Sequence, residues 1–380
     1  MPTSPTRPQP KQTNGADTKN ATPHQRRLQA VQRSVVKAGC DALLIMAPQD
    51  IRYLTGFRGE DSAAIVHGDG LVVVSDFRFQ EELNALDGVA EVVIRTGSMT
   101  RAITDVIGDL SPERLAVQAE QMTLETRREL ARNVGARLLK ETVGLLRDVR
   151  VIKDEDEIKS IQRAVKLQEE ALEATLETIG VSQRESEIAA KLEFAMKARD
   201  SEGTAFSTIA AAGANGSLPH AVPGAAKTKT GSTLLIDWGA RMGGYCGDMT
   251  RTVAFKRWPE KMEEIYKVVL EAQEAAIEAI RPGMTGKEAD AVARDIITRA
   301  GYGEAFGHSL GHGLGLDVHE HPRLSRQSDE VLKPGMVVTI EPGVYIPGLG
   351  GVRIEDDVVI TDSGARNLSS LPKDIEWATR

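Results

Sequence analysis

Five side chains able to bind metals follow one another along the C-terminal part of the chain, each inside a glycine-rich or strand-like segment. They are Asp237, Asp248, His312, Glu341 and Glu355. Hard divalent cations prefer oxygen ligands and accept an occasional imidazole, and four carboxylates balance the charge of two such ions. A fold that gathers the five would form a two-metal site, which generates a hydroxide nucleophile at neutral pH. The sequence therefore predicts a metal-dependent hydrolase.

Length and composition predict two globular domains with no nucleic-acid or membrane partner. A chain of 380 residues exceeds the usual size of one hydrophobic core. The formal net charge of -8 gives no electrostatic footprint for a nucleic-acid backbone or an anionic membrane. We recognise neither a membrane span nor a secretory signal. Only two cysteines occur, which does not suggest a disulfide framework, so we expect a cytoplasmic location.

The pattern of apolar residues predicts a mixed α/β organisation. Residues 1–24 are rich in Pro, Thr, Asn and Gln, and they are expected to form a disordered tail. Residues 25–150 alternate helical stretches with short apolar strands, which predicts an α/β domain with a mixed sheet. A charge-dense stretch at 145–157 precedes a long amphipathic helix, so we place the domain boundary there. The second domain then spans 155–380 and contains all five candidate ligands.

The first two carboxylates lie in a segment that predicts a β-hairpin with a two-residue turn at Met242 and Gly243. This register makes Asp237 and Asp248 direct cross-strand neighbours, with Cβ atoms about 4.5–5.5 Å apart. An aspartate pair in a hairpin more often consists of a turn cap and a solvated side chain. The apolar residues before Asp237 weigh against that, because burying an unpaired carboxylate costs several kcal/mol.

The last two carboxylates flank a second predicted turn, over Pro347–Gly351. Glu341 and Glu355 are an even number of residues apart, which places both on one sheet face if no bulge intervenes. Arg353 shares that face. It could orient a carboxylate or contact a substrate, or it could be an ordinary strand arginine paired with a glutamate.

Histidines cluster in the second domain, which holds five of the seven in the chain. His308 and His312 are four residues apart in a glycine-rich segment that disfavours a stable helix. His319 and His321 follow, and His220 lies in a loop stiffened by two prolines. Such a cluster favours function, with one imidazole as a ligand and others free for acid–base chemistry.

These motifs resemble the pita-bread fold of methionine aminopeptidases, aminopeptidase P and prolidase. The resemblance covers about 155–380 and rests on DWGARMGGYCGDMTRT, GHSLGHGLGLDVHE, TIEPGVY and GVRIEDD, in the family's order. The earlier segments DALLIMAPQDIRYLTGF and SDFRF resemble the N-terminal domain of the creatinase and prolidase group. The implied fold is α/β, with a creatinase/prolidase-like mixed α/β domain before a pita-bread domain whose antiparallel sheet is flanked by helices. Methionine aminopeptidases usually lack such an N-terminal domain, which favours Xaa-Pro peptidases.

The resemblance implies a dinuclear site held by the five ligands, with Asp248 and Glu355 bridging the ions. Manganese is the expected metal, and cobalt, zinc or iron are alternatives. A hydroxide between the metals would attack the Xaa-Pro carbonyl while Glu341 carries a proton to the proline nitrogen. Four further positions match the active site of the Xaa-Pro branch. His308 and His319 would hydrogen-bond the substrate and the oxyanion, and His220 and Arg353 would frame the proline-side pocket.

Within this family we expect aminopeptidase P, acting on short peptides with proline at the second position, because the short N-terminal domain looks closest to compact bacterial-type members. Prolidase, which cleaves Xaa-Pro dipeptides, is the alternative. A metal-free creatinase-type amidinohydrolase and a non-catalytic binding protein on the same fold are disfavoured, because such proteins have lost ligands that are all present here. The resemblance also implies a homodimer.

Overall fold

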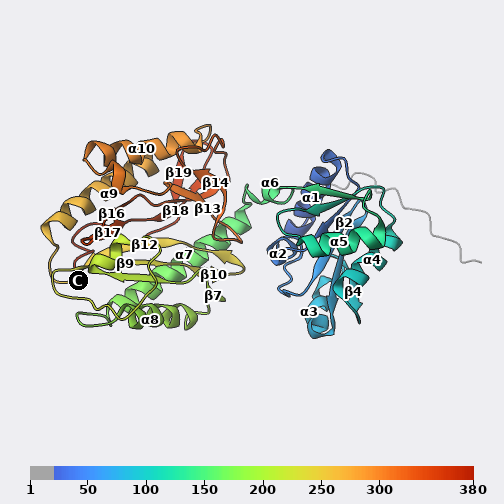
Figure 1. Ribbon diagram of the computed structural model, residues 1–380, viewed down its shortest axis with the longest axis horizontal. Coiled ribbons are helices and arrows are strands. Elements are labelled where there is room, and N and C mark those ends of the chain that lie inside the picture. Colours follow the sequence, from blue (N-terminus) through green and yellow to red (C-terminus); the bar gives the residue numbers. More distant parts are fainter. Residues whose placement is uncertain (1–20) are drawn as a thin grey trace, which may run out of the picture. The chain divides into compact units, whose positions relative to one another are not determined.

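The structure is a computed structural model that describes residues 21–380, and the chain divides into two units after Leu146 (Figure 1). The expected tail over residues 1–24 lies almost wholly outside the described residues. The first helix begins at Pro23, because Thr22 and Gln25 form a capping box before it. Among the described residues, no helix is long and apolar enough to span a bilayer.

The N-terminal unit is built on a six-stranded mixed sheet with the strand order β4-β3-β2-β1-β5-β6. The strands β1, β2 and β3 pair antiparallel, whereas β1–β5, β5–β6 and β3–β4 are parallel. Short runs of Val, Ile and Leu fill these strands, and the central ones are almost fully buried. The elements are α1 (Pro23–Lys37), β1 (Ala42–Ile45), α2 (Pro48–Thr55), β2 (Ala63–His67), β3 (Gly70–Asp76), η2 (Phe77–Phe79), α3 (Gln80–Leu83), η3 (Asn84–Leu86), β4 (Glu91–Arg95), α4 (Met99–Leu110), β5 (Leu115–Gln118), α5 (Leu124–Val134) and β6 (Leu139–Thr142).

The C-terminal unit consists of antiparallel strands between two pairs of helices, with α9 and α10 on one side and α7 and α8 on the other (Figure 1). Its helices are α6 (Arg147–Arg150), α7 (Glu155–Leu176), α8 (Glu185–Lys197), η4 (Gly213–Ser217), α9 (Glu260–Ala279), α10 (Gly286–Arg299) and η5 (Gly303–Ala305). Its strands are β7 (Gly203–Thr204), β8 (Ile209–Ala212), β9 (Thr233–Trp238), β10 (Ala240–Met242), β11 (Tyr245–Cys246), β12 (Met249–Ala254), β13 (Gly311–Gly313), β14 (Glu320–Leu324), β15 (Val337–Ile340), β16 (Gly343–Ile346), β17 (Gly350–Arg353), β18 (Asp356–Ile360) and β19 (Ala365–Asn367).

Two sheets of this unit carry two of the candidate ligands, Asp237 on β9 and His312 on β13. One has the order β12-β9-β8 and the other β14-β13-β15-β18-β19, while β16 and β17 form a separate two-stranded ribbon. The long helix α7 begins at Glu155, earlier than the apolar pattern suggests. The charge-dense stretch itself supplies the cap, since Asp154 accepts the backbone N–H groups of Asp156 and Glu157.

The predicted register of the first hairpin is wrong by two residues. Met242 pairs with Tyr245, so the turn residues are Gly243 and Gly244, both with positive φ, of 60° and 87°. Two-residue hairpin turns that match the twist of the strands need positive φ at both positions, which glycine adopts without the clash that a Cβ causes. Opposite Asp237 lies Thr250 instead of Asp248. Asp248 sits between β11 and β12, outside the ladder.

The second predicted turn is shorter than expected. Ile346 pairs with Gly350, so only the three residues 347–349 connect β16 to β17. Glu341 falls between β15 and β16, and Glu355 falls between β17 and β18. The even spacing of the two glutamates therefore does not place them in one ladder. Each lies where the chain passes between the five-stranded sheet and the two-stranded ribbon.

The observed turn leads to a stability prediction. Substituting Gly243 or Gly244 by alanine should each lower the free energy of unfolding by about 1–2 kcal/mol, because the left-handed backbone strains an L-residue. Gly364→Ala is the matched control, since its backbone φ is not positive and nothing lies near its missing Cβ. Urea unfolding of the three variants measures the effect. Equal midpoints for all three would contradict the assigned turn.

Candidate metal centre

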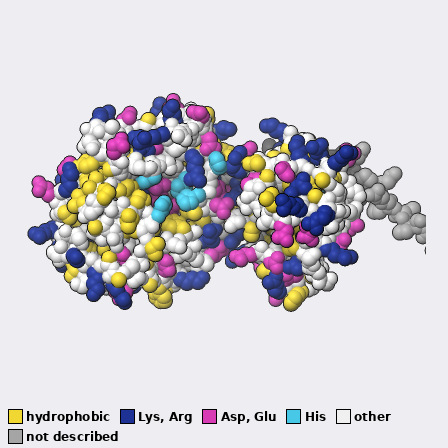
Figure 2. Space-filling model, in the orientation of Figure 1, with side chains coloured by type: hydrophobic (Ala, Val, Ile, Leu, Met, Phe, Trp, Pro, Cys, Tyr) yellow, Lys and Arg dark blue, Asp and Glu magenta, His cyan; other side chains and the backbone are white. Residues whose placement is uncertain are grey.

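The five predicted metal ligands and the four further predicted active-site residues converge on one cavity of about 680 Å³ in the C-terminal unit. Figure 2 shows histidine side chains gathered over one region of this unit. Segments more than 100 residues apart in the sequence supply the lining. The predicted site residues in the lining are His220, Asp237, Asp248, His308, His312, His319, Glu341, Arg353 and Glu355.

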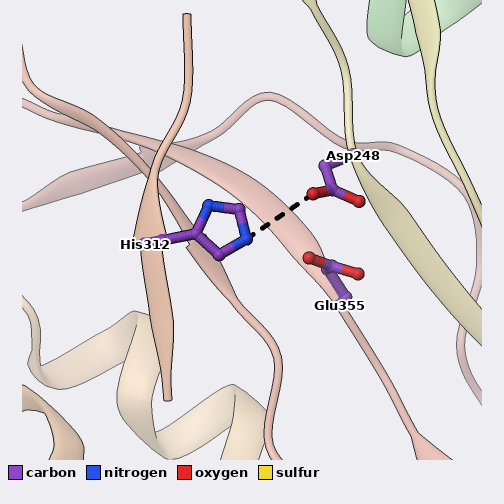
Figure 3. Close-up of side chains that lie close together, drawn as sticks. All are labelled: Asp248, His312 and Glu355. Atoms are coloured by element: carbon purple, nitrogen blue, oxygen red, sulfur yellow. Dashed lines mark ion pairs between the residues drawn. The ribbon is translucent and has the colours of Figure 1, made fainter. Parts of the chain in front are cut away.

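Asp248, His312 and Glu355 form the core of the site. One ligand atom from each lies within 4.8 Å of the others, and all three residues are buried (Figure 3). His312 Nε2 is 3.6 Å from Asp248 Oδ2. The other ring nitrogen, Nδ1, is 3.1 Å from the carbonyl oxygen of Gly313, which orients the ring and turns Nε2 towards the carboxylates.

Glu341 joins this core through the same imidazole. Its Oε1 atom lies 3.2 Å from His312 Nε2 and accepts a hydrogen bond from the Thr339 hydroxyl. Burial acts to raise the pKa of Glu341, but the hydrogen bond from His312 and nearby positive charges outweigh it and lower the pKa to about 2. Glu341 is therefore ionised at neutral pH.

Asp237 is the one predicted ligand that pairs with a cation of the chain itself. Its Oδ2 atom lies 2.5 Å from Arg353 Nη2, whereas its Oδ1 atom is buried and has no hydrogen-bond partner among the described residues. Burial raises the pKa of Asp237 against the opposing charge of Arg353. A buried oxygen without a partner is costly, and a bound cation would satisfy it.

Burial and electrostatic repulsion together shift the pKa values of the remaining two carboxylates. Burial, followed by repulsion from Glu355 and Asp237, raises the pKa of Asp248 well above its usual range. Burial, followed by repulsion from Glu341 and Asp237, does the same for Glu355. Divalent cations would reverse both effects, because they favour the charged form. The free Asp237 oxygen and the oxygen-rich donor set therefore fit a pair of divalent metal ions.

The residues that follow Glu355 hold the core in place, and sequence reasoning had given them no role. Asp357 Oδ2 accepts the backbone N–H of Asp248 at 3.0 Å. Asp356 forms a fully buried ion pair with Arg251 at 2.7 Å, and Arg251 also donates to the carbonyl oxygen of Glu355. The two aspartates thus fix the backbone positions of both expected bridging ligands.

A chain of hydrogen bonds connects His308 to Asp237. His308 Nε2 is 2.8 Å from the Tyr345 hydroxyl, which accepts a hydrogen bond from Arg353 Nη1 at 2.7 Å. Burial lowers the pKa of His308, so the imidazole is neutral at neutral pH. Sequence reasoning missed Tyr345. The available signal was its position in the strand-forming segment four residues after Glu341.

The remaining histidines and Cys246 differ in where their side chains lie. His319 and His220 are exposed at the cavity, and the His319 ring lies 4.4 Å from that of His312, centre to centre. His321 instead pairs with Glu330 at 2.8 Å. Cys246 is fully buried, and burial raises the pKa of its thiol to about 12, as in a core cysteine. Arg323, which the sequence did not single out, also lines the cavity.

Two protein families together match nearly all of the described chain. Residues 159–362 match metallopeptidase family M24, and residues 27–152 match the creatinase/prolidase N-terminal domain. Both matches confirm the predicted fold class. The resemblance inferred from the motifs is confirmed as well.

Individual relatives are similar over most of their length. An uncharacterized peptidase of Bacillus subtilis is 38% identical, over 92% of this chain and 99% of the relative. An Xaa-Pro dipeptidase of Pyrococcus horikoshii is 45% identical, over 65% of this chain and 70% of the relative. Among solved structures, an Xaa-Pro dipeptidase from Bacillus anthracis has a TM-score of 0.89 at 36% identity, covering 93% of this chain and 99% of that one. An X-Pro aminopeptidase from Thermotoga maritima has a TM-score of 0.84 at 36% identity, covering 90% and 99%.

The metal centre predicts a defined change in metal content. Elemental analysis of protein equilibrated with manganese should find two ions per chain, and Asp248→Asn should lose both, because Asp248 is expected to bridge them. Chelation should lower the midpoint of thermal unfolding of the wild type but hardly that of Asp248→Asn, since ligands that bind only the folded state stabilise it. Asp317→Asn, on an exposed carboxylate outside the cavity lining, is the control. Retention of two ions by Asp248→Asn would contradict the assignment.

Proposed function

The chain belongs to metallopeptidase family M24 and is a hydrolase, and from this premise we propose that it is an Xaa-Pro dipeptidase, or prolidase. The carrying observation is the cavity in which five metal-binding side chains meet the histidines and Arg353. In this proposal the enzyme hydrolyses the bond between an N-terminal residue and a C-terminal proline. It uses two divalent metal ions.

The proposal departs from the sequence-based preference for aminopeptidase P. Among the relatives whose names state an Xaa-Pro activity, Xaa-Pro dipeptidases and prolidases outnumber aminopeptidases, which supports the dipeptidase alternative. Aminopeptidase P remains the second candidate, favoured by the similarity to the Thermotoga maritima X-Pro aminopeptidase. The two activities differ in whether the substrate continues beyond proline.

Arg323 gives the dipeptidase proposal a physical basis. Its side chain is exposed and lines the cavity, and no ion pair of its guanidinium is recorded within residues 21–380. A dipeptide carries a free carboxylate on its proline, and a guanidinium binds a carboxylate through two parallel hydrogen bonds. A longer peptide has an amide at that point. A free arginine in the lining therefore suits a substrate that ends at proline.

In the proposed reaction the five ligands would hold both ions. When bound, these ions polarise the scissile carbonyl and lower the pKa of water. Glu341 is ionised, so its carboxylate can take the proton of the attacking water and deliver it to the departing proline nitrogen. The exposed His319 would hydrogen-bond the substrate carbonyl as charge develops on it. Both ring nitrogens of His308 are engaged, Nδ1 by the Ser309 carbonyl and Nε2 by the Tyr345 hydroxyl, so the neutral His308 would act by positioning Tyr345.

Two further parts of the proposal rest on the donor set and on the family resemblance. Manganese is the expected metal, because carboxylates outnumber the single imidazole, although cobalt, zinc or iron would also bind such a site. A homodimer is expected from the resemblance. Sedimentation of the metal-loaded chain tests the second expectation directly.

Substrate length decides between dipeptidase and aminopeptidase P. With manganese present, kcat/KM for Ala-Pro should exceed that for Ala-Pro-Ala by about tenfold or more. Arg323→Gln should lower kcat/KM for Ala-Pro by roughly 10- to 100-fold, the worth of a hydrogen bond to a charged group, and leave the tripeptide nearly unchanged. Arg326→Gln is the control, because Arg326 is exposed on the same segment but outside the cavity lining. Equal or faster cleavage of the tripeptide would identify aminopeptidase P instead.

Tyr345 should contribute through its hydroxyl. Tyr345→Phe removes the hydrogen bonds to His308 and Arg353 while keeping the ring, and it should lower kcat about 3- to 10-fold at unchanged metal content. Tyr302→Phe is the matched control, because its hydroxyl contacts Glu264 and lies outside the cavity lining. A Tyr345→Phe enzyme with wild-type kcat would remove Tyr345 from the site.

A further inference from the structure

A buried carboxylate behind the cavity holds both ends of the loop that carries His220. Glu185, the first residue of α8, is only 1% exposed. Its Oε1 atom accepts the backbone N–H of Ala212 at 2.7 Å and the Asn215 side-chain amide at 2.9 Å. Its Oε2 atom accepts the backbone N–H of Gly224 at 3.0 Å. One side chain therefore ties together two points that are twelve residues apart in sequence.

The loop between these points, residues 212–224, forms one wall of the cavity. Pro219, Ala221 and Pro223 line the cavity beside His220. Val222 lines the cavity as well, and its side chain is 87% exposed, so it adds little packing that would hold the loop. Prolines restrict the backbone of the wall, but they also remove N–H groups that could anchor it.

Few hydrogen bonds other than those of Glu185 fix this wall, although Ala221 packs in a small buried apolar cluster with Leu235 and Tyr345. Across residues 217–223 the one hydrogen bond recorded to another part of the described chain runs from Arg353 Nη1 to the carbonyl oxygen of Pro219, at 3.5 Å. The near end of the loop is held by close packing, since a Cβ at Gly351 would lie 2.1 Å from the carbonyl oxygen of Gly216. The far end, at Gly224, is held by the Glu185 carboxylate and by two backbone hydrogen bonds, from Ser186 N–H to the Gly224 carbonyl and from Glu185 N–H to the Ala226 carbonyl.

We infer that Glu185 is a positioning residue for substrate binding, which acts by fixing the wall that His220 and the two prolines present to the substrate. The identity of the substrate in this inference rests on the proposed function. Charge-assisted hydrogen bonds are stronger than neutral ones, and a carboxylate at a helix N-terminus is further stabilised by the helix dipole. Glu185 does not line the cavity, so its effect reaches the substrate only through the loop.

A loosened wall should weaken binding more than chemistry. The wall would lie beside the substrate, whereas the reacting atoms would lie next to the metal ligands and near His308. In Glu185→Gln, one amide oxygen can still accept from Ala212 and Asn215, but the amide NH2 would face the N–H of Gly224 and release that end. Loss of binding shared by ground state and transition state raises KM and leaves kcat unchanged.

The experiment compares Glu185→Gln and Glu185→Asp with Glu187→Gln, all loaded with manganese. Glu187 lies two residues along the same helix and loses the same charge, but it is only partly buried and pairs with Arg184 outside the loop. Both Glu185 variants should raise KM for Ala-Pro roughly tenfold with kcat within about twofold. Glu185→Asp keeps the charge, but its side chain is too short to contact both ends of the loop. It therefore tests whether the length of the side chain matters as well as its charge. Backbone hydrogen exchange over residues 212–226 should be faster in both Glu185 variants than in the wild type. In Glu187→Gln it should match the wild type.

Two results would overturn the inference. Unchanged KM together with unchanged exchange over residues 212–226 would show that Glu185 does not hold the loop. A parallel fall in kcat, metal content and thermal stability would show a general structural role instead. If the wild type cleaves no Xaa-Pro peptide, the proposed function fails, and the exchange comparison still decides whether Glu185 holds the loop.

Discussion

Repulsion among buried carboxylates is the constraint around which the C-terminal unit is organised. Asp248 and Glu355 lie within reach of the same imidazole in a buried position, and burial with mutual repulsion raises the pKa of both. Charges this crowded persist in a protein interior only when cations compensate them. Three of the candidate ligands, Asp248, Glu341 and Glu355, lie between strands, where the backbone can turn a side chain into the cavity without giving up a ladder hydrogen bond, whereas Asp237 and His312 lie within β9 and β13. Membership of a metallopeptidase family agrees with that arrangement.

Buried charges also hold the irregular segments that bring histidines to the cavity. On α10, the ion pair of Asp290 with Arg294 binds three backbone groups around His308: the carbonyl oxygens of Phe306 and His308 and the N–H of Leu310. Lys153 pairs with Glu320, the residue after His319, at 2.9 Å. Glu185 does the same for the loop of His220. Each segment lacks the regular hydrogen bonds of a helix or sheet, and a side-chain charge from outside the cavity replaces them.

The sequence predicted the fold class and the family, because the ligand motifs and their order are local features of the chain. The register of the first β-hairpin was less predictable. The choice between Met242–Gly243 and Gly243–Gly244 as turn residues moves Asp248 out of the ladder, and only the requirement for two positive φ angles decides it. Arg323 and Glu185 could not be found from spacing, since their roles depend on segments far away in the chain, whereas the spacing of Tyr345 from Glu341 offered a signal. The metal ligands themselves stay a prediction that metal analysis must test.

Arg353 links the parts of the site that would otherwise be independent. Its guanidinium donates to Asp237, to the Tyr345 hydroxyl and to the carbonyl oxygen of Pro219 on the wall, while Nε donates to Thr250, which in turn donates to Glu355. A lysine has one charged nitrogen and could not reach these groups together. Arg353 also changes the charge of the site. Four ionised carboxylates would balance two divalent ions, so the buried guanidinium would add a positive charge to the occupied site, which would favour the negative charge that develops on a carbonyl oxygen during hydrolysis. A strand arginine paired with a glutamate does not describe the observed contacts, because the ion-pair partner of Arg353 is Asp237, and its other partners include the Tyr345 hydroxyl and the Pro219 carbonyl on the cavity wall.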